Sequence, residues 1–389
     1  MLTELSPESQ QIVQSIRRFV DREVIPVASK LEHDNEYPAA IVEQMKDMGL
    51  FGILIPREYG GLGLNYVTYI AITEELSRGW MSLGGIINSH YIVAHAISEF
   101  GTPEQKQRYL PDMATGERRA CICMTEPNAG SDLQAIQLTA TKDGDRYLLN
   151  GTKMFVTNGR RGNLYLVLGK TDKTADPPHR GMSAFIVEQG MPGFSIGKDI
   201  EKLGYKGVDT VVLHFDNAEV DAGNLLEGKE GRGFIHIMSG IEVGRINTAA
   251  RAVGVAQAAF ADAIRYAQQR YTFGVPIAQH QAIQFKLADM ATQIEAARLL
   301  VYQAASVKDK GVRSDKEAGM AKLFATEVAG FVTLEAMRIH GGYGYTKDMR
   351  VERYYRDAPF MMIAEGTNEV QRIVIARALL REYAEGPTT

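Results

Sequence analysis

The stretch CICMTEPNAGSD, residues 121–132, lies where the pattern of the chain changes from helical to strand-like. It begins as an apolar, strand-like run and ends in a turn rich in Gly, Ser, Asn and Asp, which turns favour. Gly130 allows a close approach of the backbone, and Thr125 and Ser131 add hydroxyl groups. Composition alone favours an ordinary exit from a strand into a loop, so the role of this stretch depends on the segments around it.

Helical signals precede this stretch. Ser6 is placed to cap a helix that has Pro7 at its first position. Apolar residues then recur on one helical face. Thr102 and Gln105 form the signature of a capping box, again with proline at the first helical position. We therefore predict an all-helical N-terminal domain over residues 1–120.

Strand signals follow it. Several short, β-branched segments are separated by clusters of Gly, Asn, Asp and Pro, which is typical of strands joined by turns. Strands at this spacing predict a small sandwich or barrel, and we assign the central β domain to residues 121–233. The segments are YLLNGTKMFVTNG (147–159), LYLVLGKT (164–171), MSAFIVEQ (182–189) and TVVLHFDNAEV (210–220).

The last part of the chain is helical again. Three long helical runs follow one another, and glycines such as Gly311 and Gly341 end the second and third, as C-caps do. A fourth run begins after Thr367. Antiparallel helices of this number form a bundle, so we predict a C-terminal four-helix bundle over residues 234–389. The fold class is α+β, with helices, strands and helices in that order.

Bulk properties narrow the function. The 389 residues carry a formal net charge of −4, which gives no electrostatic basis for binding nucleic acid or an anionic membrane. Cys121 and Cys123 are poorly placed for a disulfide with each other, and so few cysteines fit a reducing compartment. We see no secretory signal, no membrane span and no cluster of metal ligands, and we expect a cytoplasmic protein.

Three further stretches are candidates for a site, and the first two allow two readings each. In KMFVTNG (153–159), Phe155 and Thr157 share a face that suits either a flat heterocycle or an ordinary half-buried strand. In the link QRYTFG (269–274), an arginine suits either a phosphate or a helix C-terminus. The glycines of RIHGGYGYTKD (338–348) permit close backbone approach, but their spacing is not that of a dinucleotide fingerprint.

Glu365 stands in the apolar stretch MMIAEGTNEV, just before a helix. An acid near a helix N-terminus contributes roughly 0.3–1 kcal/mol of stability, which is one explanation. The apolar neighbours imply a dry site, and loss of solvation raises the pKa of a carboxyl group. A raised pKa suits a general base that works near neutral pH, which is the other explanation.

Taken together, these stretches resemble the acyl-CoA dehydrogenase family of flavoproteins. That family has a TEPxAGSD segment, a K-x-W/F-I/V-T-N-G strand, an R-x-x-F-G link, a Q-x-x-GGxGY turn and an EGT motif. This chain carries a counterpart of each motif in the same order, and the resemblance runs over essentially the whole chain. Any one motif would be weak, but five in order are specific. The counterparts are residues 125–132, 153–159, 270–274, 338–345 and 365–367.

The resemblance implies that FAD lies between the β domain and the C-terminal helices. Met124, Thr125, Phe155 and Thr157 would meet the flavin ring, and Ser131 would lie near the pyrophosphate. It also implies a homotetramer, built as a dimer of dimers, in which one subunit contributes to the FAD site of another. The remaining implied FAD contacts are Arg270, Thr272, Phe273, Gln281, Arg338, Gly342, Thr367 and Asn368.

The resemblance further implies α,β-dehydrogenation of an acyl-CoA thioester to a trans-2-enoyl-CoA. Glu365 would remove the α-proton, the β-hydrogen would pass to flavin N5 as hydride, and an electron-transfer flavoprotein would take the electrons. The backbone N–H of the base and a ribityl hydroxyl would stabilise the enolate oxygen. The residues expected to contact the substrate are Ser131, Glu242, Arg245, Ala364 and Gly366.

Three positions depart from the family pattern. Some relatives place the base immediately before the arginine that aligns with Arg245, and this chain has Gly244 there. Glu242 lies about 200° away around the helix, so Glu365 is the expected base. Many members have tyrosine where this chain has Ala364, which predicts a wider pocket for a short, branched or cyclic acyl group. Arg338 replaces the family glutamine.

Two alternatives stay open: a flavin oxidase on the same scaffold that uses oxygen, and a non-catalytic protein that binds acyl-CoA or flavin. The acyl group and the pathway, whether fatty-acid, amino-acid or cyclic-acid breakdown, also stay open. Residues 84–97 are expected by position to line the acyl tunnel. Asn88, Ser89 and His90 in this run receive no assigned role.

Overall fold

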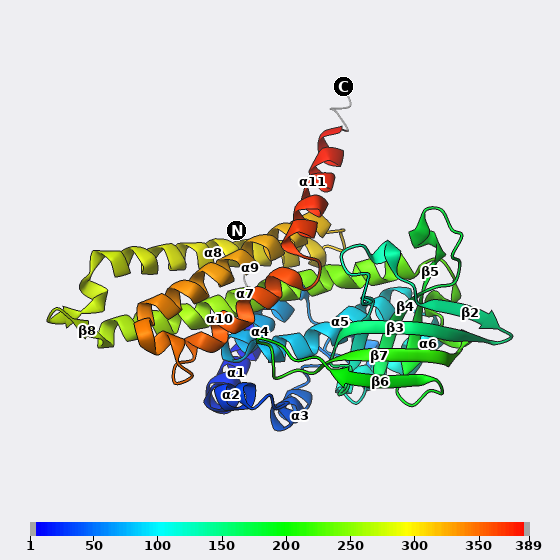
Figure 1. Ribbon diagram of the computed structural model, residues 1–389, viewed down its shortest axis with the longest axis horizontal. Helices are drawn as coiled ribbons and strands as arrows, with labels where there is room; N and C mark the ends of the chain where they lie inside the picture. The colour runs from blue at the N-terminus through cyan, green and yellow to red at the C-terminus, as the bar shows by residue number, and fades with distance from the viewer. Residues whose placement is uncertain (1–4, 385–389) are drawn as a thin grey trace.

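The computed structural model describes residues 5–384, so the outermost ends of the two predicted outer domains lie outside it. Figure 1 shows a helical bundle toward one end of the molecule, a twisted sheet toward the other, and the N-terminal helices packed along both. The chain thus follows the predicted order of helices, strands and helices. No helix among residues 5–384 is long and apolar enough to cross a bilayer.

The N-terminal part is helical, and two predicted caps are confirmed. The Ser6 side chain accepts a hydrogen bond of 3.1 Å from the Ser9 N–H. The Thr102 hydroxyl accepts one of 3.2 Å from the Gln105 N–H, while the Gln105 side chain accepts one of 3.1 Å in return. The helices are α1 (Pro7–Phe19), α2 (Ile25–His33), α3 (Ala39–Asp47), α4 (Tyr66–Gly79), α5 (Met81–Phe100) and α6 (Pro103–Thr115).

The central part is one seven-stranded sheet with the order β1-β4-β2-β3-β7-β6, in which β5 also pairs with β4. The four predicted strand segments correspond to β3, β4, β5 and β7, whereas β2 and β6 were not predicted. Both of these are short and partly exposed, so they lack a clear apolar alternation. The strands are β1 (Ala120–Cys123), β2 (Thr139–Asp143), β3 (Arg146–Thr157), β4 (Leu164–Lys170), β5 (Met182–Glu188), β6 (Phe194–Asp199) and β7 (Thr210–Asp221).

Strand β4 joins two cores. Leu164, Leu166 and Leu168 belong to the large apolar cluster that the helices build. Tyr165 and Val167, which point to the opposite face because side chains alternate along a strand, belong to a separate cluster inside the β domain. The sheet is therefore covered by helices on one face and packs its own residues on the other. Cys121 and Cys123 are both buried and free.

The C-terminal part corrects one prediction. The sequence places the fourth bundle helix after Thr367, but the helix that packs against α7 and α9 within the bundle is α10 (Val351–Ile363). Pro359 and several charged residues obscure its helical pattern. The helix after Thr367 is α11 (Asn368–Ala384), which starts beside α9 and then projects from the body (Figure 1). The long helices are α7 (Gly233–Gln269), α8 (Gln281–Asp309) and α9 (Asp315–His340).

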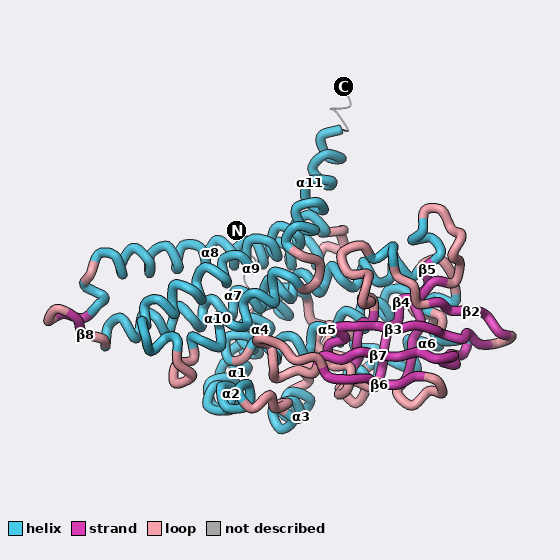
Figure 2. Tube along the Cα trace, in the orientation of Figure 1, coloured by secondary structure: helices cyan, strands magenta, loops and turns pink. Residues whose placement is uncertain are grey.

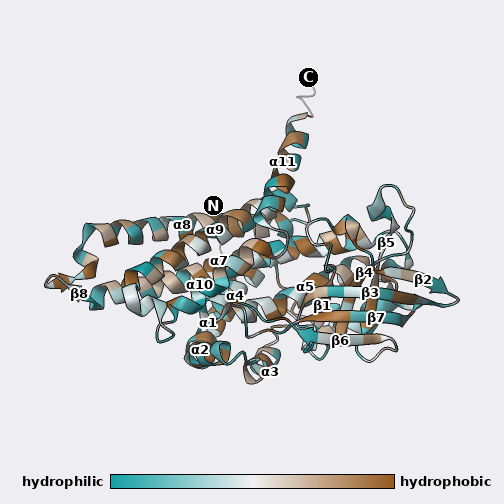
Figure 3. Cartoon of the chain, in the orientation of Figure 1, coloured by the Kyte–Doolittle hydropathy of each residue, from teal (hydrophilic) through white to brown (hydrophobic). Residues whose placement is uncertain are grey.

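Two features reach away from the body. A two-stranded hairpin, β8 (Tyr271–Thr272) with β9 (Val275–Pro276), joins α7 to α8 at the end of the bundle opposite the sheet (Figure 2). Helix α11 alternates apolar and polar colour along its length in Figure 3, and Leu380 is 71% exposed. Both features expose apolar side chains beyond the body of the described chain.

Candidate active site

A cavity of about 790 Å³ opens where the three parts of the chain meet. Helices α5 and α7, the end of α10, and the β-domain loops all contribute to its wall. Of the residues predicted for the site, those at this cavity are Met124, Thr125, Ser131, Phe155, Thr157, Arg245, Ala364, Glu365, Gly366 and Thr367. The fold thus gathers residues that lie more than 200 positions apart in the sequence.

The β-domain wall of the cavity is held by a buried ion pair. Lys153 Nζ lies 2.8 Å from Glu126 Oε1 and also donates to the Met124 carbonyl oxygen at 3.0 Å. This pair ties the loop after β1 to β3. The register of β3 shifts between Lys153 and Val156, where the backbone of Phe155 is left-handed with φ of 58°. Phe155 is 56% exposed. An exposed ring beside Thr157 presents a flat, partly polar surface to the cavity.

Glu365 lies in the turn between α10 and α11 and faces the cavity from the opposite side. Its Oε1 accepts a hydrogen bond of 2.9 Å from Asn88 Nδ2 on α5. Its Oε2 is buried and finds no partner within residues 5–384. Burial raises the pKa of this carboxyl, while the charge of Arg251 and the Asn88 hydrogen bond oppose the rise. The direction agrees with the dry site expected from the apolar neighbours.

The turn that carries Glu365 is clamped from two sides. The buried Lys322 Nζ donates to the carbonyl oxygens of Met362 and Gly366, both at 3.0 Å. Gln371 Nε2 donates to the Gly366 carbonyl oxygen at 2.9 Å. Burial lowers the pKa of Lys322 to about 7, and the nearby Glu365 carboxylate counters part of that effect. These contacts hold the backbone on both sides of the acid.

Helix α7 faces Glu365 at Gly244. A Cβ atom added at this glycine would lie 3.0 Å from Glu365 Oε2, so the glutamate occupies the space in front of it. Glu242 points elsewhere, as its angle around the helix predicts, because it binds Lys308 Nζ at 2.8 Å and the Ser314 N–H at 2.5 Å. Glu242 therefore does not reach the cavity, and its predicted substrate contact is not supported by its position.

Arg245 and Asn368, two further predicted site residues, both bind other side chains of the protein, and only Arg245 lines the cavity. Arg245 lines the cavity, and its Nη1 donates to Asp315 Oδ1 at 3.0 Å. Asn368 is buried behind the turn, where its Oδ1 accepts from Lys322 Nζ at 2.9 Å. Asn368 thus supports the turn of Glu365 and is not among the residues that line the cavity.

The remaining predicted FAD contacts lie far from this cavity. Phe273, at the tip of the β8–β9 hairpin, is 97% exposed. Thr272 donates to or accepts from His280 at 2.9 Å in the same region, beside Gln281 and Arg270. Arg338 pairs with Glu335, and Gly342 lies in the exposed turn after α9. Within one chain these residues are not brought to the cavity of Glu365.

Several residues at or behind the cavity were missed at the sequence level. Asn88 was left without a role, and Arg251 and Tyr205, which line the cavity, and Lys322, which holds the turn of Glu365, were not considered. Asn88, Lys322 and Arg251 share one sequence signal: each is a polar residue inside an otherwise apolar or alanine-rich helical run. Such a residue needs a partner once it is buried, which marks it as a candidate even before a structure is known.

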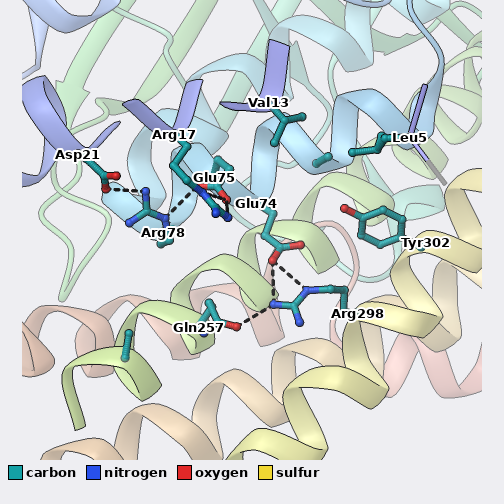
Figure 4. A pocket seen from close by; sticks show the side chains of 12 residues that line it. Leu5, Val13, Arg17, Asp21, Glu74, Glu75, Arg78, Gln257, Arg298 and Tyr302 are labelled. Carbon is teal, nitrogen blue, oxygen red and sulfur yellow. Dashed lines mark hydrogen bonds and ion pairs between the residues drawn. The ribbon is translucent and has the colours of Figure 1, made fainter. Parts of the chain in front are cut away.

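A second cavity, of about 470 Å³, lies between α1, α4, α7 and α8 (Figure 4). Arg17 and Arg78 both bind Glu75, and Arg78 also binds Asp21 at 2.7 Å. Figure 4 also shows that Arg298 donates hydrogen bonds to Glu74 and to Gln257. The charged side chains of this second cavity pair with one another and leave no unpaired charge for a ligand among these residues. The cavity of Glu365 differs, because the Oε2 atom of Glu365 has no partner in the described chain.

Comparisons with known proteins place this geometry in a class. Three family models match in succession: the acyl-CoA dehydrogenase N-terminal domain over residues 6–117, the middle domain over 121–218 and the C-terminal domain over 231–380. The three domains are those of the acyl-CoA dehydrogenases, which are FAD-dependent oxidoreductases. The chain belongs to the acyl-CoA dehydrogenase family.

Individual relatives agree over the full length. An acyl-CoA dehydrogenase of Bacillus subtilis is 46% identical over 377 residues, which cover 97% of this chain and 99% of the relative. A chain from a structural study of the electron transferring flavoprotein of Acidaminococcus fermentans has a TM-score of 0.95 and 44% identity, covering 98% and 100%. Butyryl-CoA dehydrogenase of Megasphaera elsdenii has a TM-score of 0.95 and 39% identity, with the same coverage.

Members of this family bind FAD, and the residues of this chain fit that cofactor. The wall formed by Met124, Thr125, Phe155 and Thr157 offers apolar surface and hydroxyl groups for a flat ring system. Ser131 also lines the cavity, and its hydroxyl group can donate to a phosphate. The carboxylate of Glu365 faces this wall across the cavity, so a substrate between the two meets both.

Proposed function

We propose that this protein dehydrogenates an acyl-CoA thioester at its α and β carbons, giving a trans-2-enoyl-CoA, with Glu365 as the base. The observation that carries the proposal is the buried Oε2 of Glu365, which has no hydrogen-bond partner in the described chain. Glu365 lines the same cavity as Met124, Thr125, Phe155 and Thr157, the residues that fit the flavin. A thioester makes its α C–H weakly acidic, so a desolvated carboxylate is the group that the first step needs.

The residues of this chain divide the work. Asn88 holds Oε1 of Glu365 and leaves Oε2 to take the α-proton. The backbone N–H of Glu365 donates to no acceptor in the described part of the chain, so it is available to the thioester oxygen as negative charge develops there. FAD supplies the two-electron acceptor for the β-hydrogen. The apolar walls exclude water and strengthen each of these interactions.

The test is an anaerobic titration of the purified, FAD-loaded protein with a panel of acyl-CoA thioesters. We expect at least one thioester to bleach the flavin absorbance. The variant Glu365→Gln keeps the size of the side chain and removes the base, so it should retain FAD. The rate of flavin bleaching should fall at least about 1000-fold, because both the proton acceptor and its charge are gone. A flavin that no thioester bleaches would refute the proposal.

We also propose an electron-transfer flavoprotein as the electron acceptor. The support is the likeness to the chain from the study of the Acidaminococcus fermentans flavoprotein, together with the family itself. The reduced enzyme should reoxidise faster with such a flavoprotein than with dissolved oxygen. Faster reoxidation by oxygen, measured by stopped flow, would instead support the flavin oxidase.

A homotetramer in the cytoplasm completes the proposal. Arg270, Thr272, Phe273 and Gln281 lie at the far end of the bundle, so they reach an FAD only in another subunit. Two aromatic side chains of the hairpin, Tyr271 and Phe273, are 61% and 97% exposed and together form an apolar tip that suits an interface. Ala364, in place of the common tyrosine, supports a short, branched or cyclic acyl group.

A further inference from the structure

Arg251 is a buried cation in the wall of the main cavity. It lies on α7, within the alanine-rich run TAARAVGV, and is 1% exposed. Its Nη2 donates to Thr248 Oγ1 at 2.8 Å, whereas Nε and Nη1 have no acceptor among the residues that the structure describes. A buried guanidinium with unused donors is costly unless a ligand completes its hydrogen bonds.

The surrounding elements make room for this side chain. A Cβ atom at Gly84 on α5 would lie 2.8 Å from Arg251 Cγ, and one at Gly85 would lie 1.8 Å from Tyr205 Oη. Two successive glycines inside a helix lower its stability, so their presence reflects the space that Arg251 and Tyr205 require. The arginine and the tyrosine therefore form a specific wall, because no larger residue at 84 or 85 is compatible with them.

Aromatic rings form the rest of this wall. Tyr205, in the loop between β6 and β7, stacks on Phe360 of α10 with ring centroids 4.3 Å apart. The guanidinium carbon of Arg251 lies 5.7 Å from the centroid of the Tyr205 ring and 5.9 Å from that of Phe360. Asp357 fixes the loop by accepting the Tyr205 N–H at 2.7 Å. The rings attract the cation but leave the Nε and Nη1 donors without an acceptor in the described chain.

The position of Arg251 relative to Glu365 limits the length of the acyl group that fits between them. Gly244 faces Glu365, and Arg251 follows seven residues later on the same face of α7. Seven residues advance about 10 Å along a helix, and side chains lean back toward the helix N-terminus. No hydrogen bond joins Arg251 to Glu365, although Glu365 Oε2 and two Arg251 nitrogens are all without partners in the described chain. Gly244, which faces Glu365, and Arg251 are thus about two helical turns apart, a span that a short acyl chain covers.

We propose that Arg251 binds a carboxylate at the far end of a short acyl group, so that the preferred substrate is the CoA thioester of a short dicarboxylic acid. The proposal rests on the proposed function and specifies its substrate. Guanidinium and carboxylate match in charge and in hydrogen-bond geometry. An alkyl chain of the same length would leave the cation unpaired, and sites built for a polar group discriminate strongly against analogues that lack it. The carboxylate itself takes no part in the oxidation and leaves unchanged in the product.

The experiment compares thioesters that differ only at the far end. Glutaryl-CoA and succinyl-CoA carry the carboxylate, the terminal amide of glutaryl-CoA is its neutral isostere, and butyryl-CoA lacks the group. We expect kcat/KM of the FAD-loaded enzyme to be at least about 30-fold higher for the better carboxylated thioester than for the amide or butyryl-CoA, which is the lower range for a buried charged pair. The variant Arg251→Gln should abolish this ratio, and Arg251→Lys should retain part of it.

Arg353 provides a matched control. It is also 1% exposed with Nε and Nη1 unpartnered in the described chain, but it does not line the cavity. Arg353→Gln should therefore lower the stability of the protein and leave the ratio between carboxylated and neutral thioesters unchanged. A similar loss of ratio in both variants would show that the effect arises from general damage, and would overturn the proposal.

Binding separates this inference from the proposed function. Isothermal titration calorimetry of FAD-loaded Glu365→Gln, with and without Arg251→Gln, gives dissociation constants for glutaryl-CoA and its amide without turnover. We expect the Arg251→Gln substitution to raise the dissociation constant of glutaryl-CoA by at least about 30-fold and that of the amide far less. If butyryl-CoA bleaches the flavin best, or if the substitution leaves the binding ratio unchanged, the inference fails while the dehydrogenase remains. If no thioester bleaches the flavin, the proposed function fails and the calorimetry alone decides the role of Arg251.

Discussion

At the scale of single residues, the placement of Glu365 depends on partners from other segments. Its backbone is left-handed, with φ of 56°, and Gly366 follows with φ of 82°. A glutamate adopts that conformation only when contacts impose it. Lys322 and Gln371 bind the carbonyl oxygens around the turn, and Asn88 binds one carboxylate oxygen. The acid is therefore oriented by three side chains that the EGT motif does not contain.

Asn88 should tune the pH dependence of the reaction. Its hydrogen bond favours the ionised form of Glu365 and opposes the rise in pKa that burial causes. Asn88→Ala should raise that pKa further. Because the base must be ionised, the acidic limb of the kcat/KM profile should move to higher pH by about one to two units, which corresponds to the loss of a hydrogen bond to a charged group. The measurement is the pH profile of kcat/KM with one substrate.

A second buried asparagine serves as the control. Asn247 on α7 donates to Tyr69 Oη at 2.7 Å and, unlike Asn88, makes no hydrogen bond with Glu365 in the described chain. Asn247→Ala should reduce stability by about 1–3 kcal/mol, because the phenol loses a buried partner, and leave the acidic limb in place. An Asn88→Ala profile that coincides with that of the native enzyme would contradict the assigned role.

At the scale of elements, α5 is the helix on which the substrate side of the cavity is built. Asn88 reaches the base, and Gly84 and Gly85, one turn earlier, admit Arg251 and Tyr205. Its middle is almost wholly buried, so α5 has no solvent face and little amphipathic pattern. Sequence periodicity therefore identifies the helix but not which of its polar residues meet the cavity.

Substitution of Gly85 should show how tightly this helix meets the loop before β7. Gly85→Ala places a methyl group 1.8 Å from the position of Tyr205 Oη, so the ring must move. We expect a loss of about 1–3 kcal/mol in the free energy of unfolding, as overpacking produces. With Tyr205→Ala in the background, the same change should stabilise by up to about 1 kcal/mol, because alanine favours helix and the clash is gone. Denaturant unfolding of the four proteins measures this coupling; additive effects would contradict the clash.

At the scale of the whole molecule, the cavity exists because three parts of the chain meet there. The loop before β7 is bound to both helical parts: Lys206 N–H donates to Glu32 Oε2 of α2 at 3.1 Å, and Tyr205 N–H donates to Asp357 of α10. The β-domain wall thus keeps its distance from Glu365. The β8–β9 hairpin lies at the end of the bundle opposite the sheet (Figure 2), so in the proposed homotetramer its predicted FAD contacts would serve another subunit.

Phe273 should report on assembly. Replacing this 97% exposed ring with glutamate places a charge on the hairpin tip without disturbing any buried contact of the chain. We expect Phe273→Glu to fold, to disrupt the proposed tetramer and to lose FAD, whereas Phe273→Leu retains an apolar contact and should keep both. Light scattering coupled to gel filtration gives the mass, and absorbance gives the flavin content. A Phe273→Glu tetramer with full FAD would contradict the assigned interface.

The sequence by itself determined the order of helices and strands, the two N-terminal caps, the four long strands and the family, and it singled out Glu365 as the candidate base. These features depend on local signals: a cap lies within one turn, a strand alternates residue by residue, and the five motifs are continuous. The structure alone decided that α10 and not α11 completes the bundle. It also decided that Asn88 binds the acid, that Lys322 holds its turn and that Arg251 lines the same cavity, while Glu242 turns away. A polar residue in an apolar helix looks the same in sequence whether it faces a cavity or a buried partner, because only packing between distant segments determines what lies opposite it.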